Sequence, residues 1–184
     1  MNRKKRANRP NRKQLIGIAG ACIAAVVVLL VIFLGGPGQA VTFPDPNLET
    51  AVREALNKTS EAIYASDLAG LTHLVASFRG IESLSGLQYC TSLTHLFLES
   101  NNISDISPLA DCTRLTELGL YSNQISDISP LTSLTNLMNL ELDSNKISDI
   151  SPLANLTNLT GVTLGSNWIG DISSLADLTN LTVI

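Results

Sequence analysis

Two histidines and a glutamate stand at equal intervals in this sequence, and all three are residue types that bind metals or protons. His73, His95 and Glu117 follow one another at a spacing of 22 residues. Imidazole and carboxylate groups are common zinc ligands, and neighbouring imidazoles can form a pH-sensitive pair. Side chains at one position of successive parallel strands run side by side, however, whereas zinc requires ligands that converge. We therefore predict no metal site and no cofactor.

Two cysteines repeat the same interval. Cys90 and Cys112 are 22 residues apart, and the next three positions at this spacing are leucines, at 134, 156 and 178. If the two cysteines occupy equivalent positions of neighbouring structural repeats, their Cα atoms would lie within the range for a disulfide. Their Cβ vectors would be parallel, however, and would hold the Cβ atoms wider apart than a disulfide prefers. Buried free thiols are the preferred interpretation, and a disulfide is the alternative, because exported proteins permit one.

The sequence contains no G-x-S-x-G, H-E-x-x-H, P-loop or C-x-x-C motif. Carboxylates such as Asp105, Asp127 and Asp149 recur, but always at one fixed position, which is typical of turns. A catalytic site requires unlike groups that converge, whereas a ladder of identical residues is a structural device. The sequence therefore predicts a protein that is not an enzyme.

The elements that would position these residues come from a repeat of 22 residues. One copy reads Leu115-x-x-Leu118-x-Leu120-x-x-Asn123-x-Ile125. The same pattern recurs from Leu93, Leu137 and Leu159, in a degenerate copy from Leu71 and in a partial copy from Leu181. A fixed period of this length with L-x-x-L-x-L-x-x-N indicates a leucine-rich repeat. We predict an α/β solenoid, a leucine-rich repeat arc over residues 71–184 with five copies and a partial sixth. Short parallel strands would line its concave face, and 3₁₀ or turn segments its convex face.

The alternation of side chains along a strand assigns each residue to one side. In a strand over residues 117–121, Leu118 and Leu120 would point inward, while Glu117, Gly119 and Tyr121 point outward. A ladder of buried asparagines would satisfy backbone groups where the chain leaves the sheet. Its members are Asn101, Asn123, Asn145 and Asn167.

Residues 45–70 are predicted to form a helical N-terminal cap. Asp45 followed by Pro46 is typical of a helix start. An apolar stripe follows at helical spacing, at Leu48, Ala51, Val52, Ala55 and Leu56. A second short helical segment is expected over residues 66–69. Because solenoid repeats cannot bury their own end faces, we expect this cap to cover the first repeat.

The N-terminus indicates a membrane segment. Residues 1–14 hold seven of the 12 Lys and Arg residues, and residues 15–34 carry no charge. Such a run makes about 30 Å of helix, enough to cross a bilayer. The basic tail would be cytoplasmic, with the repeats outside and residues 35–44 as a linker. An uncleaved transmembrane helix or signal-anchor is the preferred interpretation, and cleavage after the small residues 38–40 would instead give a secreted protein.

Charge excludes one class of partner. After residue 13 the chain has 16 acidic residues and five basic ones. Nucleic-acid binding relies on clustered Lys and Arg, so an acidic body of this kind is not expected to bind nucleic acid.

The repeats and the cap also carry a family resemblance. The phrase Ile-Ser-Asp-Ile-Ser-Pro-Leu occurs at residues 103–109, 125–131 and 147–153, after an Asp-x-x-Leu-Glu-x-x-Val-Arg helix at residues 45–53. Together they resemble the internalin-type leucine-rich repeats of bacterial surface proteins, over residues 43–184. The resemblance implies bacterial origin, export, and binding of a protein through the concave sheet.

The outward positions predict where a partner would bind. Phe97 and Tyr121 would be exposed among carboxylates, and aromatic side chains are frequent interface anchors. We predict an aromatic and acidic patch suited to a protein or peptide with a basic surface, on a module that is membrane-anchored or secreted. Its residues are His95, Phe97, Glu99, Glu117, Tyr121, Glu141, Asp143 and Trp168. The alternatives are a solvated face without a partner, and a structural spacer or assembly unit of a larger cell-envelope protein.

Overall fold

The computed structural model describes residues 38–183. The predicted basic tail, the transmembrane segment over residues 15–34 and the first three residues of the predicted linker lie outside the described residues. Between residues 38 and 183, none of the helices has the length and apolar character that a bilayer crossing requires.

Two helices form the cap, α2 over Pro46–Leu56 and α3 over Ala65–Leu68. Asp45 caps α2 as predicted, because its carboxylate accepts hydrogen bonds from the backbone N–H groups of Asn47 and Leu48 at 2.9 and 3.1 Å. The buried residues of the stripe are confined to the first two turns of α2, and Ala55, predicted to be part of the stripe, is exposed. The helix therefore packs on the first repeat through its N-terminal half.

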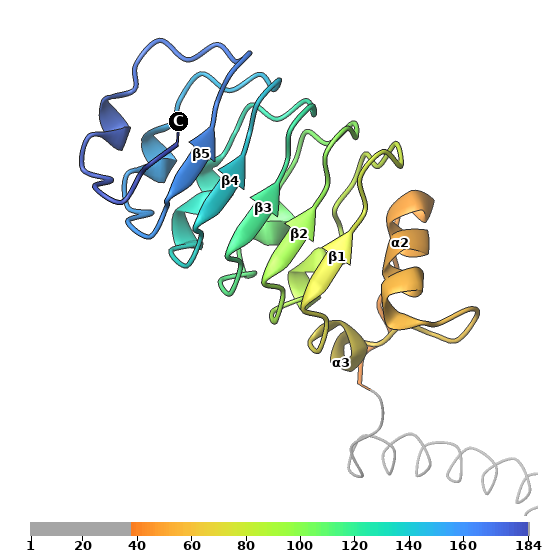
Figure 1. The fold of residues 1–184 in the computed structure, drawn as a ribbon. Coiled ribbons are helices and arrows are strands. Elements are labelled where there is room, and N and C mark those ends of the chain that lie inside the picture. The colour runs from red at the N-terminus through yellow and green to blue at the C-terminus, as the bar shows by residue number, and fades with distance from the viewer. Residues whose placement is uncertain (1–37, 184) are drawn as a thin grey trace, which may run out of the picture. The chain divides into compact units, whose positions relative to one another are not determined.

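Five short strands form one parallel sheet in the order of the chain. They are β1 (His73–Val75), β2 (His95–Phe97), β3 (Glu117–Gly119), β4 (Asn139–Glu141) and β5 (Gly161–Thr163). Figure 1 shows the strands side by side along one side of the solenoid, with α2 next to β1. The predicted fold class, a leucine-rich repeat solenoid with a helical cap, is confirmed.

β3 ends at Gly119 and is therefore shorter than the strand predicted over residues 117–121. Hydrogen bonding to the next copy continues beyond that end, with the N–H groups of Leu120 and Ser122 donating to the carbonyls of Glu141 and Asp143 at 2.9 Å. Ser122 has a φ of 57°, and this left-handed conformation turns the chain out of the sheet.

The return segments are 3₁₀ helices, as predicted. They span Leu87–Tyr89, Ser107–Leu109, Ser129–Ser133, Ser151–Leu153 and Ser173–Leu175, on the side of the solenoid opposite the strands (Figure 1). The recurring aspartates stabilise turns. The Asp105 carboxylate accepts a 2.8 Å hydrogen bond from the N–H of Ser107, and Asp127 and Asp149 make the equivalent contact. The carboxylates that recur along the return segments are thus structural.

Leucines and asparagines fill the interior between the two sides. Leu96, Leu118 and Leu140 are between 0% and 2% exposed. The side-chain amide of Asn123 donates hydrogen bonds of 3.0 Å to the carbonyls of Leu98 and Leu120. Among residues 38–183, no buried side-chain nitrogen or oxygen is without a partner. The predicted asparagine ladder is therefore confirmed, and it fixes which residues face outward.

Candidate protein-binding surface

The outward side of β1–β5, called here the sheet face, carries most of the residues predicted to bind a partner. On β2, Leu96 is fully buried, while His95 and Phe97 on either side of it are half-buried. Glu141 is exposed on β4, and Tyr121, just after β3, is 41% exposed. The predicted register is therefore confirmed for these side chains.

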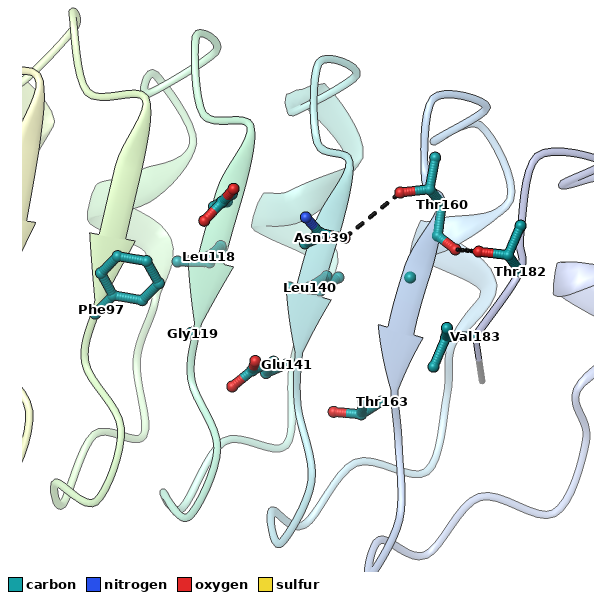
Figure 2. A pocket seen from close by; sticks show the side chains of 12 residues that line it. Phe97, Leu118, Gly119, Asn139, Leu140, Glu141, Thr160, Thr163, Thr182 and Val183 are labelled. Atoms are coloured by element: carbon teal, nitrogen blue, oxygen red, sulfur yellow. Dashed lines mark hydrogen bonds between the residues drawn. The ribbon is translucent and has the colours of Figure 1, made fainter.

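A hollow of about 300 Å³ lies on the sheet face across β2–β5. Figure 2 shows Phe97 at one end and Val183 at the other, with Gly119 and Glu141 between them. Glu117 also lines the hollow. Three of the predicted residues, one each from β2, β3 and β4, thus meet around one depression.

Glycine accounts for the depth of this hollow. A Cβ added to Gly119 would overlap the Glu99 carboxylate and would lie 3.2 Å from Cδ1 of Phe97. At Gly161 an added Cβ would lie 3.2 Å from Oδ1 of Asn139. Larger residues at these two positions would therefore fill space that neighbouring side chains and the hollow now occupy.

Two of the four predicted carboxylates have hydrogen-bond donors within the protein. The Glu99 carboxylate accepts a hydrogen bond from the hydroxyl of Ser77. The Asp143 carboxylate accepts one from the hydroxyl of Thr163 and another, of 2.9 Å, from the N–H of Gly165. These contacts orient both side chains along the sheet face.

Glu141 differs from them, because no residue in the described part of the chain donates a hydrogen bond to its carboxylate or forms an ion pair with it. Burial raises the pKa of Glu141, and the negative charges of Glu99, Asp143 and Glu117 raise it further. The Lys and Arg ion pairs of residues 38–183 lie elsewhere, at Arg53–Glu49, Lys58–Asp67 and Arg79–Glu54. The hollow is therefore lined by carboxylates and by no Lys or Arg side chain.

The histidine pair lies on the same face, next to the hollow. The rings of His73 and His95 stack with centroids 4.3 Å apart, and Nε2 of His95 lies 3.8 Å from a carboxylate oxygen of Glu117. No group of three or more His, Cys, Asp or Glu side chains within residues 38–183 is arranged to hold a metal ion. The two rings and the Glu117 carboxylate thus stand in one row across β1, β2 and β3.

Cys90 and Cys112 are buried and free, which confirms the preferred interpretation. Burial raises the pKa of Cys90 to about 12 and that of Cys112 to about 11. Both side chains pack as small apolar residues in the core, away from the sheet face.

Tyr121 and Trp168 lie outside the hollow, although both are exposed. Phe78, which was not predicted, is the most exposed large apolar residue in residues 38–183, at 78%, and has a φ of 60°. The other copies have serine at this position, with the same left-handed φ. The sequence signal that could have found Phe78 is therefore this single exception to a row of serines.

Comparison with known proteins agrees with this architecture. A family model described as leucine rich repeats (2 copies) matches residues 113–155. No curated protein matches the chain. An internalin (InlF) from Listeria monocytogenes is 41% identical in sequence over 77% of this chain, with a TM-score of 0.75. This chain spans 42% of the length of that structure. Internalin C2 (InlC2) from the same species is 38% identical, with a TM-score of 0.59, over 77% of this chain and 74% of its own.

The fold and its outward-facing surface define a leucine-rich repeat protein. Sequence identity to internalin C2, which extends over most of both chains, identifies the family within this class of proteins. The chain belongs to the internalin family, whose leucine-rich repeat proteins are binding proteins and not enzymes.

Proposed function

We propose that this chain binds a protein or peptide partner through its sheet face, at the cell surface or in the medium of a bacterium. The observation that carries the proposal is the half-buried Phe97 ring beside Glu117 and Glu141 on neighbouring strands, around a hollow that no Lys or Arg side chain lines. Aromatic side chains in partly enclosed sites are frequent energetic centres of interfaces. The acidic surroundings favour a partner with a basic surface.

The predicted domain organisation supports display outside the cytoplasm. A charge-free run over residues 15–34, preceded by the basic tail, has the composition of a membrane anchor. We propose that residues 45–70 cap the solenoid, while residues 15–34 keep the chain at the membrane. A mass of the membrane-extracted protein that includes the first forty residues supports the anchor, and a mass that lacks them indicates secretion.

A binding comparison tests the sheet face. The full chain, in nonionic detergent, is immobilised and used to isolate a partner from the extracellular fraction of the bacterium, and the affinity for that purified partner is measured. The F97A/Y121A double variant is expected to lose at least about 30-fold in affinity, as expected for interface anchors. Met138→Ala is the control, because Met138 is 46% exposed but does not line the hollow.

Equal affinity of the F97A/Y121A variant and the unaltered chain would contradict binding through this patch. If no sheet-face substitution affects an interaction that the chain does make, the alternative of a spacer or assembly unit is favoured instead.

A further inference from the structure

The hollow on the sheet face gives more detail about the partner than the acidic charge alone. It is walled by an aromatic ring at Phe97 and by carboxylates on two successive strands, Glu117 on β3 and Glu141 on β4. Its floor includes Gly119 and Gly161, where side chains would reduce its depth. A ligand group that fits here must be flat enough to lie on glycine, positive, and able to reach two carboxylates.

The carboxylates are not arranged for an inorganic cation. Within residues 38–183, no three or more metal-binding side chains converge on a point. Glu117 and Glu141 line the hollow from different strands, at the third and fifth positions of their repeats. An extended cation with several donors matches this separation better than a point charge does.

Free Glu141 is in an unfavourable electrostatic environment. Its surroundings contain three further carboxylates, and no described residue supplies a hydrogen bond or a countercharge to its own carboxylate. A cation from a partner would remove this repulsion at the moment of binding. The countercharge is therefore supplied only in the bound state, while the repulsion remains in the free chain.

Guanidinium has the chemistry that these walls require. It is planar, it stacks on aromatic faces, and it carries five N–H donors that can reach more than one carboxylate. We propose that the hollow is a subsite for one arginine side chain of the partner, which stacks on Phe97 and donates hydrogen bonds to Glu117 and Glu141. This inference rests on the proposed function, because it assumes that the sheet face is where the partner binds.

The test uses a small probe in place of the unidentified partner. Isotope-labelled full chain in nonionic detergent is titrated with N-acetyl-arginine amide, and amide chemical shifts are followed by NMR. We expect saturable shifts at Gly119, Gly161 and Thr163, which line the hollow. The matching citrulline amide, which has nearly the same shape but no charge, is expected to bind at least about tenfold more weakly, as for loss of a charge-assisted hydrogen bond.

Matched variants assign the binding to the hollow. Glu141→Gln and Glu117→Gln each remove one charge and keep the side-chain shape, and each is expected to weaken arginine-amide binding at least about tenfold. Glu82→Gln removes an equal charge at an exposed position away from the sheet face and is expected to leave the affinity unchanged. An NMR spectrum of each variant that matches that of the unaltered chain, apart from signals near the substitution, would show that the variant folds.

Three results would overturn the subsite. The first is equal binding of the arginine and citrulline amides, and the second is undiminished binding of the arginine amide to the Glu141→Gln variant. The third is displacement of the arginine amide by calcium chloride, with chemical-shift changes at the same residues. Failure of the subsite is distinguishable from failure of the proposed function. A partner that still needs Phe97 and Tyr121 while the arginine amide does not bind contradicts only the subsite.

Discussion

The carboxylate of Glu99 extends over Gly119 of the neighbouring strand, so that the Cβ of any other residue at position 119 would lie 2.7 Å from the Glu99 carboxyl carbon. The two residues belong to successive copies of the repeat, and the hydroxyl of Ser77 holds the Glu99 carboxylate from the other side. The absence of a side chain at Gly119 therefore gives the sheet face both its depth and the position of one of its charges.

Gly119→Ala is expected to reduce ligand binding with little loss of stability. The added methyl group displaces the Glu99 carboxylate and crowds Phe97, but the carboxylate is the end of a flexible side chain and can move. We expect thermal unfolding to reveal a loss of about 1 kcal/mol or less and titration to show at least tenfold weaker arginine-amide binding, about 1.4 kcal/mol. Gly170→Ala is the control, because no atom lies within 4 Å of its added Cβ. Unchanged binding to the Gly119→Ala variant would contradict the assigned floor.

Asn123→Ala is expected to destabilise the fold strongly. The substitution leaves the buried N–H of Ile103 without an acceptor. It also removes one of the two amide donors to the carbonyls of Leu98 and Leu120, which keep those of Asn101 and Asn145. One unsatisfied buried donor and two lost hydrogen bonds together cost about 3 kcal/mol. Denaturant unfolding measures the loss, and Asn102→Ala, at the exposed neighbouring position, is expected to change stability by less than about 0.5 kcal/mol. A similar small change at both positions would contradict the role of the ladder.

Asp45 is expected to make stability sensitive to acid. Burial raises the pKa of Asp45, but hydrogen bonds from the N–H groups of Glu82, Leu48, Ser83 and Asn47 outweigh it, and the pKa lies below its ordinary value. A carboxyl group whose pKa is lowered by folding stabilises the protein above the pKa of the unfolded chain and loses that contribution as the pH falls through the folded value. Unfolding measured from pH 6 to pH 2 is expected to show a smaller acid loss for Asp45→Asn. An identical pH profile would contradict this assignment.

The buried thiols are expected to be unreactive in the folded protein and to add stability that alkali removes. Folding raises the pKa of Cys90 to about 12 and that of Cys112 to about 11, from an ordinary value near 9.0. Because the folded state retains these protons, the stabilisation is complete below pH 9 and decreases as the pH rises through 11 to 12. In a Cys22→Ser variant, a thiol reagent at pH 8 should label no cysteine until denaturant is added. Two thiols should then react without prior reduction, and a count of zero would indicate a disulfide.

The period of the repeat was sufficient to predict which residues face outward. Once Leu118 and the asparagines are placed inward, alternation leaves Phe97 and Glu117 on the sheet face, and the structure agrees. The sequence did not predict where the strands end, because the left-handed turn at the eighth position is a backbone conformation that serine does not signal.

The hollow could not be predicted from the sequence either, and the reason differs from that for the strand ends. It depends on the coincidence of Gly119 and Gly161 with the directions taken by Phe97 and Glu99, and those directions are set by contacts between copies. A register assigns each side chain to a face but does not give its tilt within that face. The unpaired state of Glu141 likewise follows from the side-chain packing.

The central claim is that partners bind the sheet face, and hydroxyl-radical footprinting of the full chain with and without its purified partner tests it most directly. We expect the oxidation of Phe97 and Tyr121 to fall in the complex, while that of Met138, which is 46% exposed beside β4, stays constant. Unchanged oxidation of Phe97 and Tyr121, with protection confined to the 3₁₀ segments at residues 107–109, 129–133 and 151–153, would contradict it.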